Sequence, residues 1–489
     1  MKKHIVIQIL IILLISIATC SVVEKEHIQS DTFFSIAVGN RIVEHGFEEE
    51  DQLVWHEGLR YIYLRWGFDV VVNAIYDSFG LDGIQVFVVT LSVLQMLLYY
   101  FILNKFTKNK VLSCIGTLLM IVPLKSEFAG RAQLISFLIF IIEYYCIEEL
   151  MKTNKNRYFW ILMILPLLLV NFHTSTYPLY FMFFLPYIAE FILSKFKLKH
   201  DEFSKIIIEK RNIKKIIILI IFGIIFGFCS PSGSDAYRYV FSVMDAVSAE
   251  FISEMQPINI IDATCIAISI CAFVGIIAFT KTKVRVVDCF LVLGITIMSL
   301  NTVRYSFFFY LIASISIIRL INDFFKDYKI NLDFINPKVK MLFIVFSYII
   351  IIFVSFNNII LNYSKDYITT EDYPVNACEY IKENIDISKM KIFNHFNFGG
   401  YLELVGIPVF LDARAEMYAE EFNDTTILTD WYLLTKGEDT YSRIFEKYGI
   451  THALIYNTET INVYLKEDEN WKIIYQDDVF TLYEKGTIN

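Results

Sequence analysis

Ionisable and amide side chains gather near one set of ends of the apolar segments in this sequence. A carboxylate there can accept the proton of a hydroxyl nucleophile, and an arginine can bind a phosphate through two parallel hydrogen bonds. Because polar groups beside lipid are costly, their concentration at one membrane face predicts a functional site at that face. The side chains are Asp31, Arg65, Asp69, Glu127, Arg131, Gln133, Asn171, His173, Asp235, Glu254, Gln256 and Arg304.

Each of these residues also has a simpler interpretation. Asp31 could be a solvated residue or a helix cap, and His173 could be a histidine satisfied at the membrane interface. Arg131 and Arg304 stand at segment entrances, where an arginine can reach lipid headgroups. Arginines on the outer face are nevertheless disfavoured by the positive-inside rule, so binding an anionic group such as a lipid phosphate explains them better. The acidic run 49–51 is interpreted as a solvated loop.

The composition identifies the protein class that must position these residues. Of 489 residues, 56% are hydrophobic and 19% are charged, whereas soluble domains average about 25% charged residues. This excludes a disordered chain and a single soluble domain, and the formal net charge of −9 gives no support for nucleic-acid binding. Six of the eight cysteines lie in or beside apolar runs, and no cysteine or histidine spacing suggests a metal site. The sequence therefore predicts a multi-pass membrane protein, mainly α.

The apolar segments predict about eleven transmembrane helices, each needing about 20 residues. They are 5–22, 83–103, 111–124, 132–150, 158–171, 177–194, 214–229, 258–280, 285–300, 304–321 and 340–361. Lysine and arginine gather in every second connection, which predicts a cytoplasmic N-terminus and an extracytoplasmic C-terminus in the plasma membrane. The first segment resembles a signal peptide, but so many later spans favour an uncleaved helix.

Two regions are predicted outside the cytoplasm. The first is a large outer loop at 23–82, which belongs to a polytopic domain at 1–361. Within this loop, 63–76 has the periodicity of an amphipathic helix lying on the membrane. Residues 362–489 are predicted to form an extracytoplasmic α/β domain. Its predicted elements are helices near 374–384 and 440–448, a turn at Gly399-Gly400, and strands at 391–394, 408–412, 453–456 and 479–483.

The order of short motifs resembles the GT-C-type integral membrane glycosyltransferases, in particular a bacterial branch of that superfamily. The motifs are Asp31-Thr32-Phe33-Phe34 with Gly39-Asn40-Arg41-Ile42, Arg65-Trp66-Gly67-Phe68-Asp69, Arg131-Ala132-Gln133, Asn171-Phe172-His173-Thr174, Pro231-Ser232-Gly233, Glu254-Met255-Gln256-Pro257, Arg304-Tyr305, Gly399-Gly400-Tyr401-Leu402 and Asp412-Ala413-Arg414-Ala415-Glu416. The resemblance spans nearly the whole chain. It departs from better-known members in lacking a second acid beside Asp31.

This resemblance implies transfer of a sugar from a polyprenyl-phosphate-linked donor to an envelope glycan, lipid or protein acceptor at the outer face. The catalytic residues would be Asp31, as general base, with His173 and Glu254. Phosphate or substrate binding would fall to Arg65, Arg131, Gln133, Asn171, Arg304, Asp412 and Arg414. For Asp412 and Arg414 an internal ion pair is an equal alternative. No metal or other cofactor is predicted, because the sequence supports no divalent-metal site.

The alternative function is a non-enzymatic membrane transporter, or a scaffold for envelope-polymer assembly. Transporters tend to place polar groups at mid-membrane on broken helices and to contain internal repeats. No repeat is visible here, and the polar groups lie near the segment ends. The sequence therefore favours the transferase.

Overall fold

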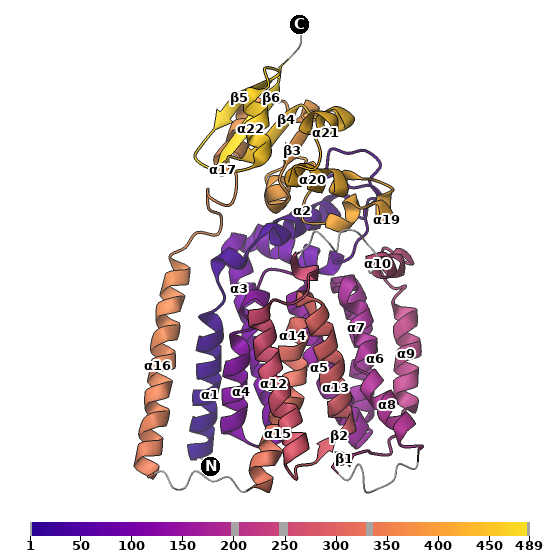
Figure 1. The fold of residues 1–489 in the computed structure, drawn as a ribbon, viewed down its shortest axis with the longest axis vertical. Helices are drawn as coiled ribbons and strands as arrows, with labels where there is room; N and C mark the ends of the chain where they lie inside the picture. The colour runs from indigo at the N-terminus through magenta and orange to yellow at the C-terminus, as the bar shows by residue number, and fades with distance from the viewer. Residues whose placement is uncertain (1, 197–204, 244–252, 329–335, 487–489) are drawn as a thin grey trace. The chain divides into compact units, whose positions relative to one another are not determined.

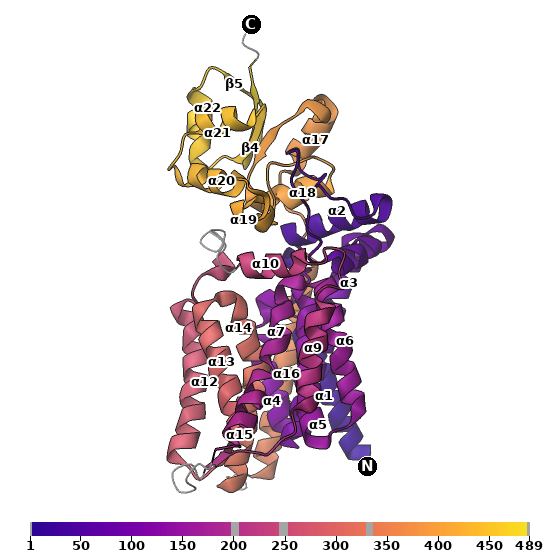
Figure 2. The same cartoon turned by 90° about the vertical axis from the view of Figure 1, so that its right-hand side faces the viewer.

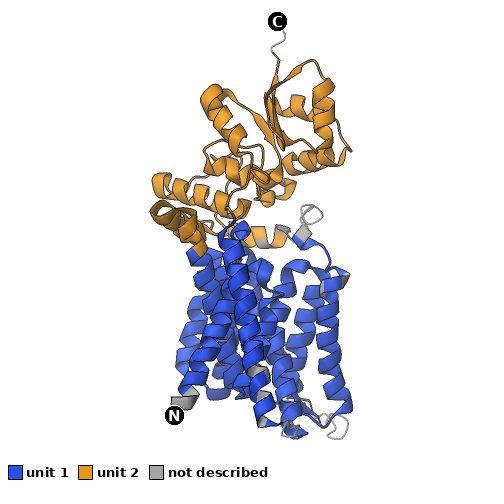
Figure 3. Ribbon diagram, turned by 90° about the vertical axis from the view of Figure 1, so that its left-hand side faces the viewer, with its two compact units in different colours: residues 1–27, 86–229, 253–365 blue, residues 28–85, 230–252, 366–489 orange. Residues whose placement is uncertain are grey.

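The protein folds as two compact units that are not contiguous in sequence, as the computed structural model shows for residues 2–196, 205–243, 253–328 and 336–486 (Figures 1 and 3). The first unit comprises 1–27, 86–229 and 253–365, and the second comprises 28–85, 230–252 and 366–489. The last boundary between the units lies at Lys365, and the predicted domain boundary at 361 stays a prediction. The predicted outer loop, however, joins the C-terminal region in one unit instead of belonging with the membrane helices.

The first unit is a bundle of helices that run side by side (Figure 2). Its helices are α1 (Lys2–Cys20), α4 (Lys110–Ile121), α5 (Gln133–Thr153), α6 (Asn156–Phe172), α7 (Tyr177–Met182), α8 (Leu185–Leu193), α9 (Lys214–Phe226), α12 (Ile260–Phe279), α13 (Val286–Asn301), α14 (Ser306–Phe308), α15 (Ser314–Asp327) and α16 (Pro337–Tyr363). Short strands β1 (Ile206–Ile207) and β2 (Val284–Arg285) pair in parallel. The helix α3 (Trp66–Thr107) continues from the second unit into this bundle.

A helix lies at each of the eleven predicted segments, but their number as membrane crossings stays a prediction. Among the described residues, four helical stretches are long and apolar enough to cross a membrane: Trp66–Thr107, Thr174–Leu193, Val303–Asp327 and Val345–Tyr363. Shorter apolar helices include Ile5–Cys20, Lys110–Ile121, Asn156–Phe172, Ala263–Phe279 and Val286–Asn301. The predicted sidedness of the termini also stays a prediction, and residues 197–204 lie outside the described residues.

A buried ion-pair network joins several helices of the bundle at the start of α13. Arg285 binds Glu148 at 2.9 Å and Asp288 at 2.6 Å, and Arg319 binds Glu148 at 3.2 Å. Tyr187 donates a hydrogen bond to Glu148 at 2.5 Å. Because the charges are paired and hydrogen-bonded inside the bundle, we interpret this network as structural.

The second unit contains a four-stranded sheet in the order β3 (Ile392–Asn394), β4 (His452–Tyr456), β6 (Phe480–Lys485), β5 (Trp471–Gln476). The pair β3–β4 is parallel and the other pairs are antiparallel, with Ile392 opposite His452 and Ala453 opposite Tyr483. Its helices are α2 (Ser30–His45), α10 (Asp235–Val243), α17 (Val375–Asn384), α18 (Gly399–Leu404), α19 (Glu420–Asn423), α20 (Ile427–Lys436), α21 (Tyr441–Tyr448) and α22 (Thr460–Glu467).

Several local predictions for this unit need correction. Gly399 and Gly400 begin a helix, α18, instead of forming a turn. The segment predicted as a strand at 408–412 is not part of the sheet and makes only one isolated parallel bridge, from Val409 to Val54. Strand β5 was not predicted. The helix predicted at 63–76 begins at Trp66 and bends at Gly80, whose φ of 63° favours glycine.

The predicted outer loop and the C-terminal region pack closely within the second unit. The Nε1 of Trp55 donates to the carbonyl of Ile392 at 2.9 Å. A Cβ built on Gly400 would lie 2.3 Å from the carbonyl oxygen of Ser30, at the first turn of α2, so α18 and α2 touch through their backbones. Only glycine permits this approach.

Candidate functional site

Two arginines of the first unit share one carboxylate. Arg131 lies just before α5, Arg304 lies in the 3₁₀ turn after α13, and Glu254 lies in the 3₁₀ turn Ser253–Met255. The Nη1 of Arg131 is 2.5 Å from Oε1 of Glu254, and the Nε of Arg304 is 3.8 Å from Oε2. The backbone N–H of Val303 donates to the carbonyl of Gln256 at 2.9 Å, which joins the two turns. We call Arg131, Glu254 and Arg304, together with Glu127, the arginine–glutamate cluster.

The two glutamates of this cluster titrate differently. Burial acts to raise the pKa of Glu254, but the guanidinium groups of Arg131 and Arg304 outweigh burial and hold the pKa below its ordinary value. For Glu127, burial and the charge of Glu254 raise the pKa to about 7, against the opposing effect of the same arginines. The cluster therefore contains one carboxylate that stays ionised and one that can exchange a proton near neutral pH.

The segment that carries Glu127 and Arg131 is fixed from its other side. The N–H of Gly130 donates to the carbonyl of His27 at 3.3 Å, and Lys125 pairs with Glu24 at 2.5 Å. These contacts fix the backbone between the 3₁₀ turn Lys125–Glu127 and the start of α5. These contacts join residues that are far apart in the sequence, so no local sequence pattern predicts them.

His173, Asn171 and Gln133 lie near the same helix ends. His173 ends α6, and its Nδ1 is 2.8 Å from the hydroxyl of Ser136 on α5. The side-chain amide of Asn171 donates to the carbonyls of Leu167 at 2.8 Å and of Cys229 at 2.9 Å, so it links α6 to the end of the segment after α9. Gln133 is the first residue of α5 and is half-buried. Gln133 thus follows Arg131 by two residues, and the contact between His173 and Ser136 joins the end of α6 to the first turn of α5.

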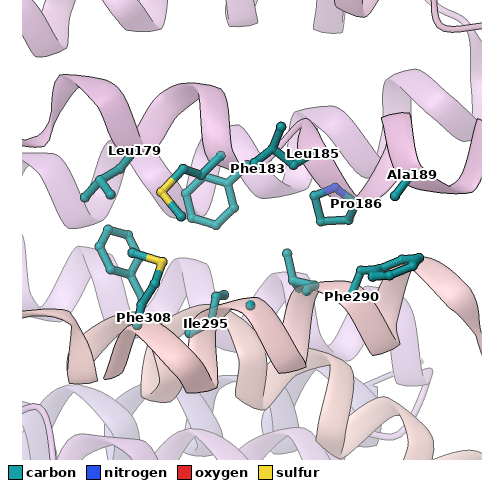
Figure 4. Close-up of a pocket in the computed structure, with 12 residues that line it drawn as sticks. Leu179, Phe183, Leu185, Pro186, Ala189, Phe290, Ile295 and Phe308 are labelled. Carbon is teal, nitrogen blue, oxygen red and sulfur yellow. The ribbon is translucent and has the colours of Figure 1, made fainter. Parts of the chain in front are cut away.

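An apolar pocket with a volume of about 200 Å³ lies between α7–α8 and α13–α14 in the same unit (Figure 4). Phe308 stands four residues after Arg304, which is about 6 Å along a helix. Leu179 is likewise in the helix that follows the short turn after His173. Two residues that line the pocket are therefore close in sequence to Arg304 and His173. The lining residues are Leu179, Met182, Phe183, Leu185, Pro186, Ala189, Phe290, Leu291, Gly294, Ile295, Met298 and Phe308.

Asp31 and Arg65 belong to the second unit. Asp31 is half-buried in the first turn of α2, where a carboxylate also stabilises the helix through its macrodipole. The guanidinium of Arg65 lies 3.9 Å from the ring centre of Phe34 and 3.9 Å from Oδ1 of Asp69. Asp69 is fully buried, and burial raises its pKa to about 7 against the effects of Arg65, Ser35 and Arg414.

Arg414 is enclosed by carboxylates of the second unit. It pairs with Asp412 at 2.5 Å, Glu403 at 2.6 Å and Asp51 at 2.7 Å, and Tyr418 donates to Asp412 at 2.5 Å. Only 2% of the Arg414 side chain is exposed. This geometry is the internal pairing that was the alternative to substrate binding for Asp412 and Arg414. Asp51 is buried in this pairing, so its interpretation as part of a solvated loop was wrong.

The predicted site residues therefore fall into two groups. Arg131, Glu254 and Arg304 meet in one cluster, and His173, Asn171 and Gln133 lie on neighbouring helix ends. Asp31, Arg65, Asp412 and Arg414 belong to the second unit. Their assigned roles stay predictions. In the described part of the chain no group of three or more His, Cys, Asp or Glu side chains is arranged to hold a metal ion, and we assign no metal site.

The sequence matches no protein-family model and no curated protein. Its structure is similar to solved structures of other proteins. The oligosaccharyltransferase of Archaeoglobus fulgidus, crystallised with a tethered acceptor peptide, shares 10% identity at a TM-score of 0.58, over 91% of this chain and 68% of the other. ArnT from Cupriavidus metallidurans, bound to undecaprenyl phosphate, shares 8% identity at a TM-score of 0.56, over 98% of both chains. At these identities the similarity concerns the fold.

Proposed function

Because the chain has the fold of the GT-C glycosyltransferases, we propose that it transfers a sugar from a polyprenyl-phosphate-linked donor to an envelope acceptor. The observation that carries the proposal is the arginine–glutamate cluster of one unit, where two half-buried arginines both lie close to the carboxylate of Glu254. Arginine geometry suits a phosphate, and ArnT was crystallised with undecaprenyl phosphate.

Arg131 and Arg304 would hold the phosphate of the donor. The apolar pocket beside α13 would receive isoprenoid units of the lipid, since it is lined by aliphatic and aromatic side chains. Glu254 would orient the two guanidinium groups, and Gln133, Asn171 and His173 would position the substrates. This division of roles uses each group for the chemistry that its charge and surroundings favour.

In the transfer step the acceptor hydroxyl oxygen forms a bond to the anomeric carbon of the sugar. The bond from that carbon to the phosphate oxygen breaks, and the polyprenyl phosphate leaves with the bonding electrons. The arginines stabilise the negative charge that develops on the phosphate. Asp31, assigned as general base from the sequence resemblance, would take the hydroxyl proton. The proposal includes no metal and places the reaction at the outer face of the plasma membrane.

Binding of undecaprenyl phosphate to the purified full-length protein tests the proposal. Arg131→Ala should weaken binding on the order of 10- to 100-fold, because a charge-assisted hydrogen bond contributes about 1.5–3 kcal/mol. Arg131→Lys should also weaken it, because an ammonium cannot make the paired contact. Arg157→Ala, an exposed arginine at the start of α6, is the matched control and should bind as the wild type does.

A second lipid separates the proposed function from the alternative. Undecaprenol, which lacks the phosphate, should bind more weakly than undecaprenyl phosphate and should not respond to Arg131→Ala. Equal binding of the alcohol and the phosphate would contradict a phosphate site and favour a scaffold or transporter. Once a donor is identified, Asp31→Asn should lower the transfer rate by about 10²- to 10⁴-fold while lipid binding persists.

A further inference from the structure

The apolar pocket of the first unit has a buried floor and an exposed rim. Leu291 and Ile295 in its wall are buried, whereas Leu185 and Phe290 are exposed at the surface of the helix bundle. Figure 4 shows the walls from the two helix stretches facing each other across the pocket. In a membrane bundle the exposed rim meets the hydrocarbon chains of lipids. A lipid chain can therefore enter the pocket from the side.

The pocket follows α13 away from the turn that carries Arg304. Its lining residues on α13 extend from Phe290 to Met298, which is about 12 Å along the helix axis. The carbonyl of Met298 accepts a hydrogen bond from the N–H of Thr302 at 3.1 Å, and Thr302 stands two residues before Arg304. A phosphate held by Arg304 would thus place the chain attached to it at the near end of the pocket.

Gly294 lies in the pocket wall, midway between Phe290 and Met298 on α13. A Cβ built on Gly294 meets no atom within 4 Å, whereas one built on Gly116 of α4 would lie 2.8 Å from the side chain of Ile318. The φ of Gly294 is not positive, so neither close packing nor backbone conformation requires glycine there. Within a helix, glycine is also less stable than alanine. What glycine provides at this position is open space in the pocket wall.

The shape of the pocket, and not its polarity, decides which chain it favours. The pocket lining and the bilayer interior are both apolar, so a chain that moves between them gains little from leaving water. The gain comes from close contact between atoms, and it is lost wherever a gap remains. A linear alkyl chain would leave the space beside Gly294 empty, whereas an isoprenoid chain carries methyl branches that can fill it.

We propose that the apolar pocket selects isoprenoid chains over linear alkyl chains, and that Gly294 is the specificity-determining residue because it leaves room for a methyl branch. The inference rests on the proposed function, since Arg131 and Arg304 would hold the phosphate of the same lipid. It adds which part of the lipid is recognised. A pocket about 12 Å long covers only the isoprene units nearest the phosphate, and the remainder of the chain lies in the bilayer.

The experiment compares the affinities of the full-length protein for hexahydrofarnesyl phosphate and dodecyl phosphate. The two lipids have the same head group and the same saturated main chain, and only the first carries methyl branches. The wild type should bind the branched lipid more tightly, on the order of threefold to tenfold. Gly294→Ala should remove this preference by weakening the branched lipid alone, because the added methyl group occupies the space of the branch. Gly294→Leu should weaken both lipids, because its side chain fills the pocket.

Gly275→Ala and Gly275→Leu on α12 are the matched controls. A Cβ built on Gly275 also meets no atom within 4 Å, and Gly275 is not among the described residues that line the pocket. Both control variants should bind the two lipids as the wild type does. Thermal unfolding of all four variants checks that they fold, since replacing a helical glycine in open space should not destabilise the helix.

The outcomes separate this inference from the proposed function. If neither these lipids nor undecaprenyl phosphate bind the wild type, the proposed function is overturned. Equal wild-type affinity for the branched and the linear lipid would overturn the selectivity and leave the phosphate site standing. An equal loss for both lipids in Gly294→Ala, or the same losses in the Gly275 variants, would do so too. Binding of undecaprenyl phosphate alone would overturn recognition through the units nearest the phosphate.

Discussion

The two units use arginine in opposite ways. Arg414 of the second unit is 2% exposed and pairs with three carboxylates, whereas Arg131 and Arg304 of the first unit are 24% and 31% exposed and share one close carboxylate. A guanidinium that is enclosed by three acidic side chains has no direction left from which a ligand can approach. A half-buried guanidinium is partly exposed, so a ligand can reach it.

This difference separates a structural arginine from a binding arginine better than sequence motif does. Arg131 and Arg414 both occur in motifs that resemble the same family. Their surroundings, however, predict that replacing one damages stability and replacing the other damages ligand binding. The following predictions test that contrast.

Arg414→Met should have the largest effect on stability. It leaves Asp51, Glu403 and Asp412 buried without their cation, and breaking a buried pair in this way costs about 3–5 kcal/mol. Arg131→Met should change stability by less than about 1 kcal/mol, because its partner is half-exposed. Thermal unfolding of the full-length protein, with hydrogen exchange at β3 and β4 as a local readout, compares the two. Equal destabilisation would contradict the distinction.

Asp412→Asn and Glu403→Gln should differ although both acids bind Arg414. Burial acts to raise the pKa of Asp412, but Arg414 lowers it to about 2, so Asp412 stabilises the fold above its unfolded pKa of 3.8 and loses this contribution as pH falls towards 2. Asp412→Asn should therefore cost about 2 kcal/mol at pH 7.

Burial raises the pKa of Glu403 well above its ordinary value, against the effect of Arg414, so Glu403 keeps a proton in the folded state. Its contribution to stability is then lost as pH rises above 4.5, the value without burial. Glu403→Gln should therefore stabilise the protein at pH 8 relative to the wild type, have little effect at pH 5, and flatten the pH dependence between these two values. Unfolding curves across this range measure both effects. A larger loss of stability in Glu403→Gln than in Asp412→Asn would indicate that the proton resides on Asp412 and not on Glu403.

Gly400→Ala should have a smaller effect that is confined to the second unit. Its Cβ would lie 2.3 Å from the carbonyl oxygen of Ser30, so α18 and α2 must separate, at a cost of about 1–3 kcal/mol. Gly275→Ala on α12 is the control, since a Cβ there meets nothing within 4 Å. It should be neutral or stabilise the helix by up to about 1 kcal/mol. Hydrogen exchange of 30–45 in each variant checks whether α2 is displaced.

The sequence predicted the helical segments because apolar runs and basic connections are local signals. It also predicted α17, α21, β3, β4 and β6 at nearly their observed positions. It failed at 408–412, where an apolar run packs against Val54 from far along the chain instead of joining the sheet. It also failed at Gly399-Gly400, because a pair of glycines required for close helix packing resembles a pair required for a turn.

The residues of the candidate site also differ in whether a local sequence signal could predict them. Arg131, Glu254 and Arg304 could be found because each is an unexpected charge at the end of an apolar segment. Asp51 and Glu403 gave no such signal: an acid in a polar stretch looks solvated until its partner is known. Arg414 shows the limit most clearly, since its partner Asp51 is 363 residues away in sequence and no local pattern connects them.

The discontinuous make-up of the second unit has a consequence for how the protein is made. Residues 28–85 leave the ribosome early, yet Asp51, Trp55 and Ser30 find their partners only after residues beyond 390 have been synthesised. At about 5–20 residues per second, this segment waits for roughly half a minute with its apolar surface uncovered. Quality control during biogenesis would act during this interval. A premature stop codon near the end of the gene would remove the partners of residues 28–85 and leave their apolar surface uncovered.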